Sequence, residues 1–332
     1  MNQTFQNFEV IVVDDCSTDS SCAIVESYIP KFGGRLTLSH MEENSGSGAL
    51  PRNKGLPLSR GEYVFFMDAD DMLTKTALEE MYTLAKNYNA DVISCEKYYR
   101  LKEGELELRL TGIHKGTLVD KPTFESKDLA ERIRKFCNNR PWSSSWVKVV
   151  KRNVLIENHI VFPKLSIAED IIWTVEILCC AKKILRVPNL VYIYRESFDS
   201  VMIKKRTVEA QINVMLNPII RGVKFLDKFL NRFDFFKQNV QYRYAVMDTF
   251  IQIQLSAILG FSAKIPVYEM DKIFRQEFAE DMGEQSALIS YLCSTINLYR
   301  LQLIQTQQQF NQFAVQAQAR IKELEAELNK KN

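Results

Sequence analysis

The chain has 332 residues, of which 46% are hydrophobic and 25% are charged, and its formal net charge is +2. This composition is typical of a globular protein with a hydrophobic core, and the small net charge gives no reason to expect nucleic-acid binding. The seven scattered cysteines lack Cys-x-x-Cys spacing, and the three histidines are far apart in the sequence. We therefore expect reduced thiols rather than disulfides, and neither a zinc site nor a histidine-based metal site.

The sequence shows no stretch that would cross a membrane. No apolar run approaches the roughly 20 residues of a spanning helix, and no basic-then-apolar leader is present. We expect a protein without a transmembrane segment, located in the cytoplasm or peripheral to the inner face of the membrane.

The first predicted strand covers residues 8–15 and ends in two acids, Asp14 and Asp15. The elements that follow are turn and capping residues at 16–20, a helix over 19–29 that Pro30 and two glycines end, a strand at 35–40, a loop at 43–48 and a helix at 49–58. Strands that alternate with helices at this spacing predict βαβ units and a mostly parallel sheet.

A second apolar strand runs into three more carboxylates. Residues 64–67 are apolar and are followed by Asp68, Asp70 and Asp71. Parallel strands end at one edge of a sheet, where ligands bind. Carboxylates this close repel one another unless a cation offsets the repulsion, and Mg²⁺ or Mn²⁺ shared with substrate phosphates would do so. The alternative is that Asp70 or Asp71 caps the next helix.

The rest of the chain changes from mixed to helical. We expect helices at 74–88, 126–137, 151–158 and 169–182, strands at 91–98, 146–150 and 191–195, and an irregular or hairpin region at 103–120. Beyond residue 205 the apolar spacing predicts helices near 206–231, 234–260 and 268–282, with Pro218 and Pro266 as breaks.

The tail from 286 to 332 contains no glycine or proline. Its apolar residues recur at steps of three and four, as in a coiled-coil seam: Phe310, Phe313, Ala317, Ile321, Leu324 and Leu328. Assembly of a homo-oligomer through 305–330 and packing of the helix onto its own domain are both open at this point. The mixed charge of the tail disfavours a membrane-surface helix.

Five motifs, in order, resemble those of family-2 glycosyltransferases. Residues 12–19 resemble "VVDDGSTD", Asn44 with 52–55 resembles "N…ARNxG", 61–71 resembles "GEYIxFLDxDD", 168–170 with Trp173 resembles "xEDxxF/W", and Tyr194, Arg195 and Ser200 resemble "YxYR…S". Each motif alone is weak evidence, but five matches in the right order are specific.

This resemblance implies a GT-A fold and inverting transfer from a nucleotide-sugar donor, expected to be UDP-linked, to a glycan or polysaccharide acceptor. It implies donor contacts by Asp14, Asp15, Asn44, Arg52, Asp68 and Arg195. It implies a Mg²⁺ or Mn²⁺ ion on Asp68 and Asp70, a general base at Asp170, and acceptor-side positions at Glu169 and Trp142. The chemistry fits, since inversion needs a carboxylate base and charge stabilisation for the leaving diphosphate.

Ordinary structural roles compete with three of these assignments. Asp170 would also serve as a helix N-cap residue. Arg195 would also form a salt bridge with Glu196, although an arginine there suits a phosphate. Trp142 and Trp146 are either an acceptor platform or buried core residues.

The chain departs from the family pattern at its start. Members of the family begin with a strand and a helix, and residues 1–5 resemble only the end of that helix. We expect the strands at 9–14 and 63–68 each to lose one partner, the strand that normally lies between them, through either a misplaced start or a truncation. Cys16 replaces a usual glycine, which matters only if that position requires a positive φ.

We predict a GT-A domain at 1–203, with a donor half at about 1–100 and an acceptor half at about 101–203, a helical region at 204–285, and the tail at 286–332. Two other functions stay open. An inert, truncated domain would act as a scaffold through its helical tail, and a nucleotidyltransferase would also use paired acids, a metal and a nucleotide.

Overall fold

The structure, a computed structural model, describes residues 2–110, 118–139, 143–196, 206–262, 268, 272–273, 275–276 and 302–321. The chain divides into two compact units. The first comprises Met1–Arg206 and Val214–Gln254, and the second comprises Thr207–Asn213 and Leu255–Asn332.

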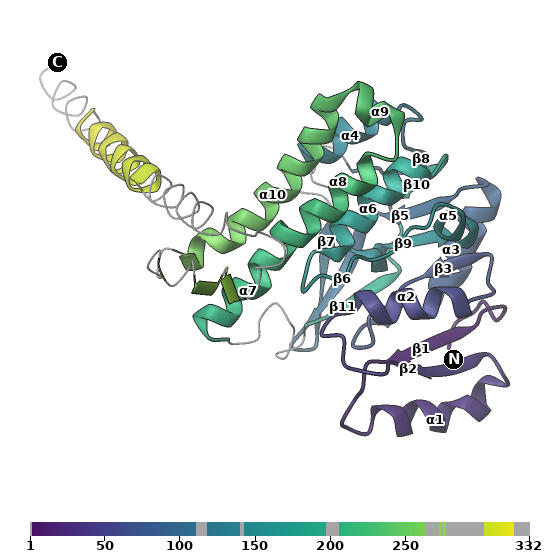
Figure 1. Ribbon diagram of the computed structural model, residues 1–332. Coiled ribbons are helices and arrows are strands. Elements are labelled where there is room, and N and C mark those ends of the chain that lie inside the picture. Colours follow the sequence, from purple (N-terminus) through teal and green to yellow (C-terminus); the bar gives the residue numbers. More distant parts are fainter. Residues whose placement is uncertain are drawn as a thin grey trace, which may run out of the picture. The chain divides into compact units, whose positions relative to one another are not determined.

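The N-terminal part of the first unit is built on two parallel strands, β1 (Val10–Asp14) and β2 (Leu36–His40). Helix α1 (Ser21–Phe32) connects them, and α2 (Ala49–Leu58) follows β2 and lies close to β1 (Figure 1). Among the described residues β1 pairs only with β2, and all of its residues are half-buried. This part of the unit is therefore thin and partly open to solvent.

A five-stranded sheet in the order β3-β9-β5-β10-β8 forms the centre of the unit. Its strands are β3 (Tyr63–Phe65), β9 (Lys148–Lys151), β5 (Val92–Cys95), β10 (Ile184–Val187) and β8 (Thr123–Phe124). Alternate residues of β5 enter two different cores: Ile93 packs in the cluster of Met81, and Val92 in the cluster of Trp173. The sheet is thus buried on both faces, with α3 (Ala77–Asn87) on one side and α6 (Glu169–Cys180) on the other.

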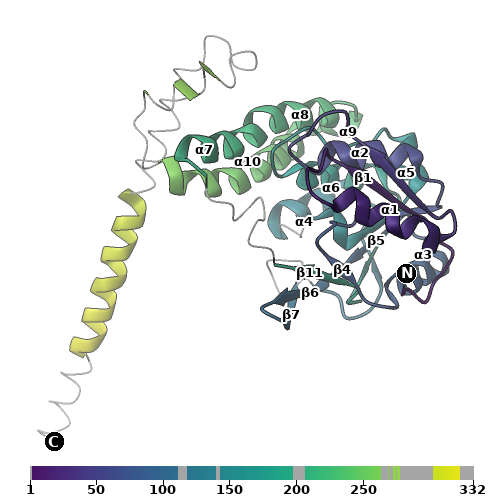
Figure 2. The ribbon, with the colours of Figure 1, turned by 90° about the horizontal axis from the view of Figure 1, so that it is seen from below.

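A second sheet of four strands has the order β4-β11-β6-β7 (Figure 2). The strands are β4 (Met72–Leu73), β11 (Tyr192–Arg195), β6 (Lys97–Lys102) and β7 (Glu105–Leu110). A two-residue turn with positive φ at Glu103 and Gly104 joins β6 to β7. The first part of the region expected at 103–120, up to residue 110, is therefore a hairpin.

The remaining helices are α4 (Leu129–Asn139), α5 (Arg152–Glu157), α7 (Val208–Asn217), α8 (Val223–Leu230), α9 (Asp234–Gln238) and α10 (Val240–Ser262). A π-helical turn, Pro218–Gly222, lies at the predicted break between α7 and α8. A Cβ atom at Gly222 would lie 3.0 Å from the Phe250 ring, so a glycine is needed where α10 approaches this turn. Residues of α4, α6, α8, α9 and α10 form the third core cluster.

Three expectations need correction. The sheets are mixed rather than mostly parallel, since only three of the eight strand pairings among the described residues are parallel. In the central sheet β9 is antiparallel to both of its neighbours, and the β6–β7 hairpin and the short strands β4 and β8 add three further antiparallel pairings. The strand expected at 91–98 breaks at Glu96 into β5 and β6, which join different sheets, and α1 continues past Pro30 to Phe32.

In the second unit, residues 302–321 form a continuous helix. Several of its large apolar side chains are more than half exposed, namely Leu303, Phe310, Phe313, Val315 and Ile321. Leu324 and Leu328 of the predicted seam lie outside the described residues, as does most of the helix expected at 268–282. The coiled coil therefore remains a prediction.

Candidate active site

Arg52, in the first turn of α2, lies at the centre of a cluster of carboxylates. Its guanidinium donates from Nη2 to Asp68 Oδ1 at 2.7 Å and from Nη1 to Glu169 Oε1 at 3.0 Å. The same Nη1 lies 3.5 Å from Asp170 Oδ1. The side chain is only 15% exposed, and it stands over the Phe162 ring at 5.2 Å. One cation thus joins the acids after β3 to those that begin α6.

The backbone around this cluster is shaped to hold it. A Cβ atom at Gly48 would lie 3.0 Å from Arg52 Cζ, so the glycine gives the guanidinium its space. Ala168, the residue before α6, is in the left-handed region with a φ of 66°. This conformation costs a non-glycine residue roughly 1–2 kcal/mol. It is held in place partly through Ser166, whose N–H donates to Asn217 Oδ1 at 3.1 Å.

The two carboxylate oxygens of Asp170 differ in their hydrogen bonding. Oδ2 accepts a hydrogen bond from the Ser145 N–H at 3.2 Å, whereas Oδ1 accepts none from the described residues. Burial raises the pKa of Asp170 and that of Glu169, and the Arg52 charge only partly offsets it. Because one guanidinium serves three carboxylates, this pair is poised to take up a proton.

Lys148 is a second cation near this cluster, and none of the sequence motifs includes it. It is 5% exposed, lies in β9, and donates from Nζ to the Ser144 carbonyl at 2.9 Å. Burial lowers the pKa of Lys148 to about 8, against the charges of Asp170, Cys95 and Glu96. In the sequence, Lys148 is flanked by Val147, Val149 and Val150. A lysine within an apolar strand indicates a buried charge with a partner, because a buried charge is seldom left unpaired.

Asp70 and Asp71 are adjacent in sequence and differ in role. Asp71 is buried and accepts hydrogen bonds from Tyr192 Oη at 2.6 Å and from the Arg195 N–H at 2.8 Å. Burial raises the pKa of Asp71 to about 6, although these hydrogen bonds lower it. The neighbouring charges of Asp70 and Asp68 raise it further. Asp71 therefore ties the loop after β3 to β11.

Asp70 is exposed, and its carboxylate forms no hydrogen bond or ion pair with the described residues. Together with Asp68 it offers the oxygen ligands that Mg²⁺ and Mn²⁺ prefer, and the exposure leaves room for water or phosphate ligands. These two residues thus fit a hard divalent cation. The Asp70 carbonyl accepts a hydrogen bond from Arg195 Nε at 2.6 Å, so the predicted donor residue Arg195 is held beside this loop.

The residues predicted to contact the nucleotide gather after β1. Asp15 accepts from the Ser45 N–H and Oγ, both at 2.9 Å, and Asn44 donates to the Asp15 carbonyl at 2.8 Å. Asp14 accepts from the Ser17 N–H at 3.2 Å. No hydrogen bond or ion pair within the described residues joins this group directly to Arg52.

Of the two tryptophans considered for the acceptor side, only Trp146 lies within the described residues. Trp142 lies outside the described residues, so its acceptor-side position stays a prediction. Trp146 is 5% exposed and stacks on Tyr192, with ring centres 4.5 Å apart, which makes it a core residue.

Comparison with known proteins finds relatives of the N-terminal part of the chain, which carries the first three motifs. Residues 1–155 match the family model "Glycosyl transferase family 2". The N-terminal part of the chain is thus similar to family 2 glycosyltransferases. Over 205 residues, 60% of the chain, it is 33% identical to the poly(ribitol-phosphate) β-N-acetylglucosaminyltransferase TarP of Staphylococcus aureus. Over 188 residues, 56% of the chain, it is 32% identical to the poly(ribitol-phosphate) β-N-acetylglucosaminyltransferase TarS of the same species.

The fold around this matched part is also shared with TarS. The crystal structure of S. aureus TarS 1–349 in complex with UDP-GlcNAc matches with a TM-score of 0.61 at 22% identity, covering 89% of this chain and 82% of that one. This likeness confirms the predicted GT-A-like α/β fold with a helical C-terminal region. The sequence matches span 58% of TarP and 30% of TarS. Within the described residues, none of the helices has the length and apolar character that crossing a membrane would require.

Proposed function

We propose that this protein transfers a sugar from a UDP-sugar to a hydroxyl group of a polymeric acceptor, with inversion at the anomeric carbon. The supporting observation is the guanidinium of Arg52, which contacts Asp68 on the donor side and Glu169 and Asp170 on the acceptor side. A single cation that links the two half-sites keeps the reacting groups at a fixed separation, which such a transfer requires.

The acceptor class is suggested by the relatives. TarP and TarS are named as enzymes that glycosylate poly(ribitol phosphate). We propose for this chain an acceptor of the same kind, a polyol-phosphate or glycan polymer of a cell surface.

Asp170 would act as the general base. It would take the proton of the acceptor hydroxyl while that oxygen forms a bond to the anomeric carbon and the bond to the diphosphate breaks. Its Oδ1 atom accepts no hydrogen bond from the described residues, although it lies 3.5 Å from Arg52 Nη1, and it would receive the proton. Arg52 and the Ser145 N–H would hold the carboxylate in place.

The donor would be held by the remaining predicted residues. Asp14, Asp15 and Asn44 would contact the uracil and ribose, and Arg195 would face the phosphates. Asp68 and Asp70 would hold Mg²⁺ or Mn²⁺, which when bound supplies charge stabilisation to the leaving diphosphate.

Calorimetric titration of UDP, with and without Mn²⁺, tests this proposal on the whole chain. We expect binding that requires Mn²⁺, loss of this Mn²⁺-dependent binding in Asp70→Asn, and UDP as the product of transfer. A release of pyrophosphate would instead support the nucleotidyltransferase. Failure to bind UDP, GDP or dTDP, with or without Mn²⁺, would overturn the proposal in favour of a scaffold.

We further propose that the protein is cytosolic and self-associates. The cysteines of the described residues are all free, as in a reducing compartment.

The helix at 302–321 exposes Phe310 and Phe313 at 65% and 68%, which suits a seam between two copies. Light scattering should show a dimer or higher oligomer that Phe310→Glu converts to a monomer, while Gln308→Glu on the same helix leaves it intact. A monomeric wild type would refute self-association. The domain boundaries at 203 and 285 remain part of this proposal.

A further inference from the structure

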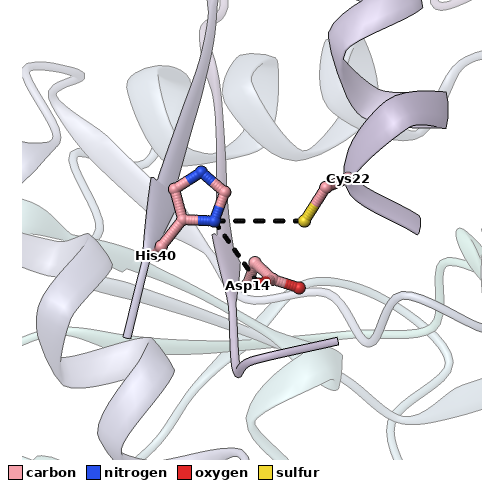
Figure 3. A group of neighbouring side chains, drawn as sticks. All are labelled: Asp14, Cys22 and His40. Atoms are coloured by element: carbon pink, nitrogen blue, oxygen red, sulfur yellow. Dashed lines mark hydrogen bonds and ion pairs between the residues drawn. The ribbon is translucent and has the colours of Figure 1, made fainter. Parts of the chain in front are cut away.

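Three potential metal ligands meet at the carboxyl ends of β1 and β2, away from Asp68 and Asp70 in the sequence (Figure 3). Asp14 Oδ2 lies 3.4 Å from His40 Nδ1, and Cys22 Sγ lies 3.9 Å from the same nitrogen. All three ligand atoms lie within 4.8 Å of one another. Their side chains converge on a common point in Figure 3.

Regular secondary structure brings these residues together. Asp14 and His40 are direct partners in the parallel register of β1 and β2, and Cys22 is the second residue of α1. Paired residues of neighbouring strands point to the same face of a sheet. A site built on two strands and a helix holds its ligands more firmly than one built on loops.

The ligand types favour zinc. A carboxylate, an imidazole and a thiolate form a mixed set that suits a borderline cation such as Zn²⁺ and not Mg²⁺ or Mn²⁺, which prefer oxygen. In a tetrahedral zinc site the bond lengths place neighbouring ligand atoms about 3.3–3.6 Å apart. The observed 3.4 Å and 3.9 Å therefore require only small side-chain adjustments.

The surroundings are acidic and accessible. The carboxylates of Asp14, Glu26 and Asp19 all lie close enough to the Cys22 thiol to interact with it electrostatically. The same negative charges attract a cation, which would displace the thiol proton on binding. The His40 side chain is 54% exposed, so a fourth ligand has access from solvent. Lys54, whose Nζ donates to the His40 carbonyl, is the opposing charge nearby.

We propose that Asp14, Cys22 and His40 bind one Zn²⁺ ion, with a water molecule as fourth ligand. Spacing along the sequence argued against such a site, because the ligands are separated by 8 and 18 residues and match no linear zinc motif. A consequence, which rests on the proposed function, is that Zn²⁺ occupies the Asp14 carboxylate and so competes with the nucleotide.

Titration of the whole chain with Co²⁺, a spectroscopic substitute for Zn²⁺, tests the site without any activity assay. We expect a thiolate-to-cobalt charge-transfer band that saturates at one equivalent and disappears when Zn²⁺ is added. Cys22→Ser should abolish the band, and His40→Gln should weaken Co²⁺ binding by at least about tenfold.

Cys16→Ser is the matched control, because the Cys16 thiol faces the Met41 carbonyl at 3.5 Å rather than His40, and it should keep the band. Absence of the band in the wild type, or its persistence in folded Cys22→Ser, would overturn the proposal.

The consequence is tested by UDP titration in Mn²⁺ with and without one equivalent of Zn²⁺. We expect Zn²⁺ to weaken UDP binding at least tenfold in the wild type and not in Cys22→Ser. Equal UDP affinity with Zn²⁺ bound would overturn the competition. If UDP does not bind under either condition, the proposed function fails while the cobalt result still decides the metal site.

Discussion

The two carboxylate clusters look alike in the sequence and differ in their electrostatics. Each follows an apolar strand. After β1, hydrogen bonds from Ser17 lower the pKa of Asp14 to about 2, with help from Cys22 and His40. After β3, burial raises the pKa of Asp71 to about 6. The first cluster is satisfied largely by neutral donors at the edge of the fold, and the second lies beside a buried guanidinium.

This difference shows that the pKa of a carboxylate in such a cluster depends on the groups that pack against it. Neutral N–H and hydroxyl donors stabilise a carboxylate in its charged form. Burial does the opposite at Asp71, and also at Glu169 and Asp170, which Arg52 joins to the second cluster and whose burial its charge offsets only in part. The second cluster is therefore the one suited to accept a proton.

Replacing Arg52 with methionine should break the second cluster most severely. Asp68, Glu169 and Asp170 would lose their shared cation while staying largely buried. We expect the free energy of unfolding to fall by about 3–5 kcal/mol and sugar transfer to be lost, as measured by urea unfolding and a UDP-release assay.

Arg60→Met is the matched control, since Arg60 is 78% exposed and pairs with Glu9 at 3.2 Å. This substitution should lower the free energy of unfolding by less than about 1 kcal/mol. Equal losses in the two variants would contradict a special role for the buried cation.

Asp170→Asn should lower the rate of transfer by about 10²–10⁴-fold, because an amide cannot take the acceptor proton. The affinity for UDP should not change. Glu169→Gln should cost less, since the Glu169 carboxylate is already bound by Arg52. Kinetics with calorimetry would check both variants, and a larger loss in Glu169→Gln would reverse the assignment of the base.

The two clusters should give the stability opposite pH dependences. The folded pKa of Asp71, about 6, lies above its ordinary 3.8, so the folded state holds this proton more tightly. Its protonation contributes about 3 kcal/mol to the free energy of unfolding. This contribution is present below about pH 4 and is lost as the pH rises through 6. For Asp14 the folded pKa of about 2 lies below 3.8, so its contribution is present above about pH 4 and lost as the pH falls through 2.

Urea unfolding across a pH series measures both effects. Asp71→Asn should flatten the slope between about pH 4 and 6, whereas Asp14→Asn should leave that slope and reduce the one below about pH 4. An unchanged slope in Asp71→Asn would show that its carboxylate is not the buried titrating group.

The smallest expected effects on stability are at two residues whose backbone is in the left-handed region, one beside each cluster. Cys16 has a φ of 61° and Ala168 a φ of 66°. Cys16→Gly and Ala168→Gly should each raise stability by up to about 1 kcal/mol by removing the Cβ clash, less the entropy cost of glycine. Thermal unfolding would show this as a small rise in Tm. A fall in Tm would mean that the side chain contributes more through packing than its backbone costs.

The amino-acid sequence by itself determined most of the elements and the motifs that end them. The helix at 49–58 and the strands near 10–14 and 36–40 follow from local apolar spacing, capping residues and glycines, which act over a few residues. The positive φ at Cys16 was anticipated as the condition under which its replacement of a glycine matters. The acids after each strand marked the candidate site, and the family resemblance agreed with the fold found.

Only the tertiary structure decided which of these acids share a partner. Arg52 and Glu169 are separated by 117 positions, and Asp71 became a buried structural acid only because Tyr192 packs on it. The antiparallel entry of β9, the burial of Lys148 and the meeting of Cys22 with His40 have the same origin. Local spacing encodes which face of an element is apolar, whereas long-range packing chooses what that face meets, and burial and charge depend on that choice.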